Sequence, residues 1–169
     1  LIDVDKKYVT AVETALGGAM QNIIVETEED AKAAIAYLRK TASGRATFLP
    51  ISSVHGKKLD NEKELRQMTG YVGIASDLIK YDTRYDGVIK SLLGRVAVAD
   101  NIDNAIAINR KFGYRFKTVT LEGDALNAGG SMAGGSVNKQ SGFLSRAAEI
   151  KTLAKEISDA AAKLRIIEE

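Results

Sequence analysis

The sequence contains no cysteine and only one histidine, His55, among its 169 residues. A chain without cysteine can form neither a disulfide framework nor a thiolate metal site, and this composition is typical of a reducing cytosol. The longest apolar runs cover only a few residues, far short of the roughly 20 that cross a bilayer. The N-terminus also lacks a charged-then-apolar signal pattern. We therefore expect a cytoplasmic protein without a membrane segment.

Charge and proline are also sparse. The chain has 24 Lys and Arg residues against 22 Asp and Glu residues, for a formal net charge of +2. So mild an excess does not by itself indicate nucleic-acid binding, which would have to come from local basic clusters. Only one proline, Pro50, and no low-complexity tract interrupt residues 1–127. We expect any lobes in that stretch to be closely joined.

The hydrophobic pattern of the first half predicts a helix, a strand, a second helix and a second strand. Residues 5–16 place apolar side chains on one helical face before Gly17 and Gly18, which favour a helix end. An apolar strand at 22–26 follows. Thr27 is a suitable N-cap for the next helix, because acidic residues occupy its first turn. A strand at 46–51 completes this unit.

The same order recurs in the second half, which indicates an internal pseudo-repeat. We expect a helix at 83–93, a strand at 96–99, a helix that ends at Phe112 with Asp100 or Asp103 as its cap, and a strand at 118–121. A polar loop and a strand at 71–75 connect the two units. The predicted fold class is α/β with two similar lobes. Their expected extents are about 1–75 and 76–145, within one domain at 1–145.

From residue 146 the pattern becomes that of a coiled-coil arm. Apolar residues alternate spacings of three and four, the seam of a two-stranded coiled coil. They are Ile150, Leu153, Ile157, Ala160, Leu164 and Ile167. A helix of this length is marginal alone in water. A terminal helix packed on the domain is therefore the alternative to an arm at 146–169.

Five glycines lie within the thirteen positions 123–135. Glycine permits positive φ and close backbone approach but costs conformational entropy on folding, so this density indicates tight turns or a surface where another backbone packs. Nucleotide binding is disfavoured. The segment lacks the G-x-x-x-x-G-K-[ST] frame of a phosphate-binding loop, and it lacks the G-x-G-x-x-G spacing of a dinucleotide fold.

The spacing of Gly123, Gly130, Gly134 and Gly135, G-x6-G-x3-G-G, resembles the signature of the hinge in structural-maintenance-of-chromosomes (SMC) proteins. Further segments resemble that hinge in the same order over residues 1 to about 145. They are Ala15–Gly18, Gly44–Pro50, Leu92–Val96 and Val119–Asp124. Many relatives carry Thr where this chain has Ala133, a change between small residues.

The resemblance implies a half-ring domain with coiled-coil stubs at both ends that pairs with an identical chain through two equivalent interfaces. We expect strand addition there, beginning from the strand that enters the glycine segment. The interface residues expected on this basis are Val119, Leu121, Gly123, Gly129, Gly130, Gly134 and Gly135. The resemblance also implies a chromosome-condensing and segregating parent ATPase, whose ATP and Mg²⁺ bind at heads outside this chain. The chain itself is expected to be no enzyme and to hold no cofactor or metal.

The resemblance also implies DNA binding at the hinge, so we expect some basic residues to make weak, salt-dependent phosphate contacts at the nucleoid. The candidates are Arg39, Lys40, Lys57, Lys58, Arg115 and Lys139. Solvated surface charge is the alternative for each, which would leave a purely structural dimerisation module. A nucleotide-binding α/β enzyme is the remaining alternative. His55 has no nearby nucleophile, and Asp124 is better explained as a carboxylate that bonds its own loop.

Overall fold

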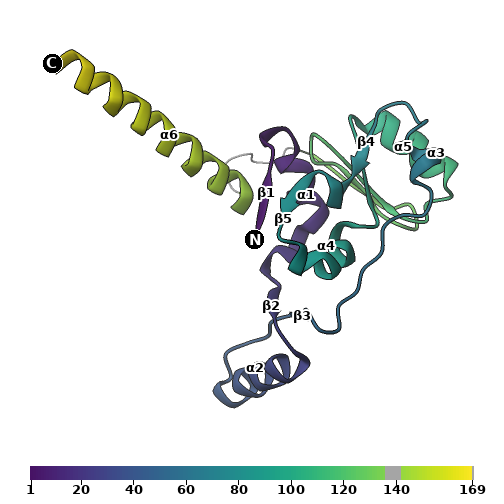
Figure 1. Cartoon of the computed structure of the whole chain (residues 1–169). Coiled ribbons are helices and arrows are strands. Elements are labelled where there is room, and N and C mark those ends of the chain that lie inside the picture. The colour runs from purple at the N-terminus through teal and green to yellow at the C-terminus, as the bar shows by residue number, and fades with distance from the viewer. Residues whose placement is uncertain (136–141, 169) are drawn as a thin grey trace.

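Figure 1 shows a main body, a small lobe and one long projecting helix. This is a computed structural model that describes residues 1–135 and 142–168. The α-helices are α1 (Val9–Leu16), α2 (Glu28–Thr41), α3 (Glu62–Leu65), α4 (Asp86–Leu93), α5 (Ile102–Lys111) and α6 (Phe143–Glu168). The strands are β1 (Ile2–Val4), β2 (Ile23–Val25), β3 (Phe48–Pro50), β4 (Tyr71–Ile74), β5 (Ile79–Tyr81), β6 (Val96–Ala99), β7 (Lys117–Thr120), β8 (Ala125–Leu126) and β9 (Met132–Ala133). Short 3-10 helices are η1 (Lys6–Tyr8), η2 (Gly17–Gln21), η3 (Ala75–Asp77) and η4 (Thr83–Tyr85).

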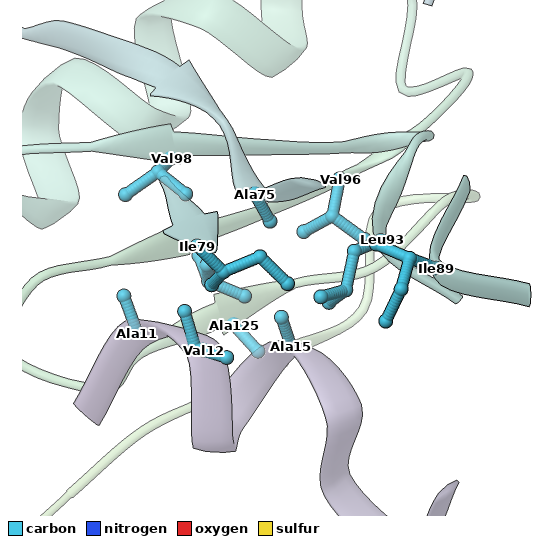
Figure 2. Packing of buried hydrophobic residues seen from close by; sticks show 11 residues of the cluster. Ala11, Val12, Ala15, Ala75, Ile79, Ile89, Leu93, Val96, Val98 and Ala125 are labelled. Carbon is cyan, nitrogen blue, oxygen red and sulfur yellow. The ribbon is translucent and has the colours of Figure 1, made fainter. Parts of the chain in front are cut away.

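The main body is built on a sheet with the strand order β4-β6-β7-β8-β9. β6 and β7 are parallel, and the other neighbours are antiparallel. All four residues of β6 are buried, because side chains alternate between two covered faces. Val96 and Val98 pack in a cluster with α1 and α4, whereas Ala97 and Ala99 pack in a second cluster with α3 and α5. Figure 2 shows the first cluster, with Val12 of α1 facing the sheet.

The small lobe is one parallel β-α-β unit, β2-α2-β3, with the register Ile23 to Phe48. α2 begins at a capping box, in which Thr27 accepts from the Asp30 N–H and the Asp30 carboxylate accepts from the Thr27 N–H. Ala31 is the one residue of α2 that is buried. Neither buried cluster of the described chain includes a residue between 17 and 58. The small lobe therefore has secondary structure without a core of its own.

Residues 51–61 lead from the small lobe back to the main body along α4, and we call them the return segment. The Gly56 N–H donates to the Gly87 carbonyl at 2.9 Å, and the Leu59 N–H donates to the Gly94 carbonyl at 3.0 Å. A side chain at Gly56 would overlap the backbone of α4, and a side chain at Gly87 would overlap the Val54 carbonyl. Glycine is thus needed on both sides of this backbone contact. The contact ties the return segment to the body.

α6 leaves the main body as a single straight helix (Figure 1). Its first turn is anchored, since Leu144 packs against the first buried cluster. Farther along, Ile150, Leu153 and Ile157 are exposed to solvent. The expected arm is therefore helical from Phe143, slightly before the predicted boundary, and the domain does not cover Ile150, Leu153 and Ile157.

The structure confirms the α/β class and the two repeated units, which are β2-α2-β3 and β6-α5-β7. The chain begins within the domain fold, because Ile2–Val4 form β1, paired antiparallel with β5. The cap of α5 was assigned wrongly. Asn101 occupies it and accepts from the Asn104 N–H at 3.0 Å. α1 packs in the cluster beneath β6 and β7, so a helix of the expected first lobe lies in the core of the second.

Candidate dimer interface

The glycine segment folds as two consecutive hairpins at one edge of the main sheet. In the first, the β7–β8 turn is closed by Thr120 and Asp124, whose backbone groups pair at 2.9 Å. The Thr120 hydroxyl donates to the Asp124 carboxylate at 2.9 Å and accepts from the Asp124 N–H at 3.0 Å. The second hairpin joins β8 to β9 and is closed by the Asn127 N–H, which donates to the Ser131 carbonyl at 2.8 Å. The Asp124 carboxylate therefore bonds its own loop, through the Thr120 hydroxyl.

The expected interface glycines meet two different structural requirements, a positive φ angle or the absence of a side chain. Gly123, Gly129, Gly130 and Gly135 adopt positive φ values of 101°, 84°, 95° and 134°. L-residues rarely adopt this region, so the turns themselves require glycine. At Gly134 a side chain would overlap the Asp124 carboxylate of the same chain. Gly129, Gly130, Gly134 and Gly135 are also exposed, whereas Gly123 is buried.

The strand that carries Val119 is not a free edge. β7 lies between β6 and β8, and Val119 is fully buried. Leu121 is half-buried against the first cluster. The expectation that strand addition begins at 119–121 was therefore wrong, because these backbone groups already pair within the sheet. The free edge at this end is β9, where Met132 is 55% exposed and Ala133 is also exposed.

Beside this edge lies a groove of about 480 Å³ whose floor contains Lys117. The Lys117 ammonium donates to the carbonyls of Thr14 at 2.9 Å and Ala15 at 3.1 Å, at the end of α1. A cation at a helix C-terminus stabilises the helix dipole. Burial lowers the pKa of Lys117 below its ordinary value. The groove is lined by Thr14, Lys117, Gly123, Ala125, Asn127, Ala133, Gly134 and Gly135.

The small lobe is the second candidate surface for an interface, after the β9 edge. Within residues 1–135 and 142–168, β2 and β3 pair only with each other, so each has an outer edge without a sheet partner there. Ile23 is 45% exposed on β2, and Ile35 is 44% exposed on α2. A groove of about 570 Å³ runs between α2 and the sheet, with Ala31, Ile35 and Pro50 in its wall. This lobe exposes apolar side chains and strand edges together.

The basic residues predicted to contact DNA are not gathered on one face. Arg39 and Lys40 lie in the last turn of α2, in the small lobe. Lys57 and Lys58 lie in the return segment beside α4. Lys58 forms an ion pair with Asp77, which leaves less of its charge available to a phosphate.

Arg115 follows α5, which Figure 1 shows at the upper right, well apart from α2 at the bottom. It shares a small cleft with Arg95, and its Nε donates to the Phe112 carbonyl at 3.0 Å. Arg95 was not singled out from the sequence, because no basic neighbour marks it. Lys139, the remaining predicted contact, lies outside the described residues.

The described part of the chain contains one histidine and no cluster of metal-ligating side chains. His55 is exposed in the return segment. No group of three or more metal-ligating His, Cys, Asp or Glu residues occurs among residues 1–135 and 142–168. In the same ranges, no helix combines the length and apolarity needed to span a bilayer.

Comparison with known proteins agrees with this arrangement. Residues 1–109 match the family model described as the SMC proteins flexible hinge domain. The chain belongs to the SMC hinge family. The chromosome partition protein Smc of Halothermothrix orenii is 43% identical over 158 residues, which cover 92% of this chain. The Smc of Bacillus subtilis is 38% identical over 173 residues, which cover all of this chain. The chain spans only 13% and 14% of these relatives.

Solved SMC hinges have the same fold. A crystal structure of an asymmetric dimer of the Geobacillus stearothermophilus SMC hinge domain matches with a TM-score of 0.87 and 39% identity, and the match covers 99% of this chain and 68% of that one. The Pyrococcus furiosus SMC hinge domain matches with a TM-score of 0.67 and 33% identity, over 80% of this chain and 68% of that one. The long helix α6 falls within the first of these matches.

Proposed function

We propose that this SMC hinge joins two copies of its chain into a homodimer. The observation that carries the proposal is the small lobe, in which a two-stranded parallel sheet and α2 lack a buried cluster. Parallel strands are normally covered on both faces, and a sheet of two strands is marginal by itself. A second copy supplies the missing cover. The asymmetric dimer of the Geobacillus stearothermophilus hinge supports this reading.

In this proposal the β9 edge of one copy meets the small lobe of the other. No described strand pairs with the outer side of β9, and the same holds for β2 and β3. Met132 and Ile23 are exposed apolar residues on these edges. Because the two surfaces differ, a two-fold axis generates the contact twice and closes the assembly. The exposed glycines around β9 let the partner's backbone approach without side-chain obstruction.

The interface is tested by placing a charge on each edge. Met132→Asp and Ile23→Asp each change an exposed side chain, so the monomer fold is expected to survive. Each should weaken dimerisation by about 100-fold or more, because a carboxylate would be buried without a partner. Sedimentation equilibrium measures the dissociation constant. Ala107→Asp is the matched control, since Ala107 is exposed on α5 and lies outside the proposed contact.

Two results would contradict the proposed dimer. Dimers of unchanged affinity in both edge variants would reject the proposed contact. A wild-type chain that stays monomeric at high micromolar concentration would reject dimerisation itself. Circular dichroism on each variant separates loss of pairing from loss of folding.

The parent role follows from the family. We propose that the chain is the hinge segment of a longer chromosome-condensing and segregating ATPase at the nucleoid, and that α6 begins one of its coiled-coil arms. Ile150, Leu153 and Ile157 are exposed at spacings of three and four, as a coiled-coil seam requires. In this proposal ATP and Mg²⁺ act at heads elsewhere in the parent, and the hinge segment performs no catalytic step.

A weak DNA contact is the second part of the proposal. It is best placed at the cleft lined by Arg95 and Arg115, where two cationic side chains outnumber the one acidic side chain, Asp60. Arg95→Glu with Arg115→Glu should lower duplex affinity at low salt by about tenfold and make the salt dependence shallower. Lys6→Glu with Lys7→Glu reverses the same number of charges at exposed residues outside the candidate contacts and is the control. If the wild-type chain binds no DNA at low salt, it is a purely structural joint.

A further inference from the structure

The last turns of α1 contact two parts of the molecule that are distant in sequence. Glu13 contacts the start of α6, which lies 131 positions later in the chain. Thr14 and Ala15 contact β7 and the turn at Gly123, which lie more than 100 positions later. Figure 1 shows α1 inside the main body, close to the start of α6. A short stretch of one helix therefore lies between the arm and the glycine segment.

At the arm, Glu13 stabilises the start of α6. The Leu144 N–H donates to the Glu13 carboxylate at 2.7 Å. The first N–H groups of a helix have no partner within the helix, and a carboxylate that accepts one of them also stabilises the helix dipole. A side chain at Gly142 would overlap the Glu13 carboxylate, so the chain passes close to this group. Leu144 also packs against the cluster that contains Ala11 and Val12.

At the glycine segment, the next two residues of α1 hold β7 and its turn. The Thr14 hydroxyl donates to the Thr10 carbonyl at 2.8 Å and lies 3.4 Å from the Gly123 carbonyl. Lys117 of β7 donates to the carbonyls of Thr14 and Ala15, as described above. Thr14 and Lys117 also line the groove that Gly134 and Gly135 border. A shift of this turn of α1 would therefore change the groove beside β9.

We propose that residues 13–15 of α1 couple the direction of the arm to the shape of the glycine segment. Glu13 is the positioning residue for α6, and Lys117 transmits its position to β7. That the glycine segment, residues 123–135, is a dimer interface is part of the proposed function, and the coupling depends on it. The anchoring of α6 by Glu13 does not, since every contact involved lies within one chain.

The absence of cysteine allows a direct measurement of arm direction. Spin labels are placed at Glu156→Cys on α6 and Asp103→Cys on α5, both exposed, and the labelled chain is diluted into excess unlabelled chain. The distance distribution should be narrow in this parent and at least about twofold wider with Glu13→Ala. Glu13→Gln keeps an oxygen that accepts the Leu144 N–H and should stay narrow. Glu29→Ala, on α2, is the control and should also stay narrow.

A change at β7 tests the coupling from the glycine segment towards the arm. Lys117→Met keeps a long side chain but loses both bonds to α1, and it should widen the same distance distribution. By reciprocity, Glu13→Ala should raise the dimer dissociation constant by about fivefold or more. An unchanged arm distribution with Glu13→Ala in a folded chain would overturn the anchoring.

The two proposals fail in different ways. A monomeric wild-type chain with a narrow, Glu13-dependent arm would remove the dimer and leave the anchor standing. A normal dimer affinity together with a widened arm would overturn the coupling. Circular dichroism confirms that each variant is folded before these results are compared.

Discussion

Gly134 lies against the carboxylate of Asp124 in its own chain, and that carboxylate in turn accepts the Thr120 hydroxyl. A larger residue at Gly134 would disturb the β7–β8 turn before any partner is considered. Substitution there would mix a folding effect with a pairing effect. Met132 has no such internal role, because its side chain is mostly exposed. It is therefore the cleaner position at which to test the interface.

Tyr71 gives a pH-dependent prediction. Its hydroxyl is buried and has no hydrogen-bond partner among the described residues. Burial, with a smaller contribution from Glu62, raises the pKa of Tyr71 to about 12 from the ordinary value of 10.0. Above pH 10 the unfolded phenol loses its proton while the folded phenol keeps it. The folded state therefore loses stability as the pH rises from about 10 towards 12.

The Tyr71→Phe variant isolates this effect. The wild-type chain should lose unfolding free energy more steeply than the variant between pH 8 and pH 11, with a difference on the order of 1 kcal/mol. Urea denaturation at each pH measures it. Near pH 8 the variant should be about as stable as the wild type, since it removes only an unpartnered buried hydroxyl. Parallel pH profiles for the two proteins would contradict the assignment.

At the scale of elements, periodicity predicted the long, amphipathic parts of the fold well. The two β-α-β units and the Thr27 cap were confirmed, since each depends on local signals such as alternation, acidic first turns and glycine stops. Short elements were not foreseen. α3 has four residues and β9 has two, too few for a period to be visible.

The sequence predicted which segment forms the candidate site, but it did not predict how the strands of that segment pair. The sequence marks the glycine segment, because five glycines in thirteen positions are unusual. It does not reveal that the chain turns back twice there, which buries β7 and leaves β9 at the edge. Register across hairpins depends on long-range packing, and Val119 looks the same in sequence whether its strand is central or peripheral.

The return segment gives a prediction about element packing. At Gly56 a side chain would overlap the α4 backbone at Lys90 and Ser91, which cannot move without shifting the helix. Gly56→Ala should therefore lower the free energy of unfolding by about 1 to 3 kcal/mol, as overpacking does. Gly18→Ala is the matched control, because nothing lies within 4 Å of the added carbon. Urea denaturation of both variants measures the difference. Equal stability of the two would show that the segment is not held against α4.

At the scale of the whole molecule, stability is distributed unevenly. The main body has two buried clusters on either side of its sheet, whereas the small lobe has strands and a capped helix without a cluster. A lobe of this kind gains its apolar cover only by association. In the proposed dimer, two reciprocal contacts would cover both small lobes at once.

Reciprocity of this kind can be tested by mixing two variants that do not dimerise alone. In a Met132→Asp homodimer both contacts carry a damaged β9 edge, and in an Ile23→Asp homodimer both carry a damaged small lobe. In the mixed pair, one contact combines the intact small lobe of the first chain with the intact β9 edge of the second. The other contact carries both charges. One undamaged contact should therefore restore association to well above that of either variant alone.

Native mass spectrometry of the mixture, with one chain isotopically labelled, measures this directly. The mixed dimer should dominate over both homodimers, because it is the only species with an undamaged contact. A symmetric contact of β9 with β9 would behave differently: every Met132→Asp chain would damage each interface it enters, and mixing would rescue nothing. A statistical mixture of the three species would show that neither edge lies in the contact. The relative amount of mixed dimer therefore distinguishes a dimer in which β9 contacts the partner's small lobe from one in which β9 contacts the partner's β9.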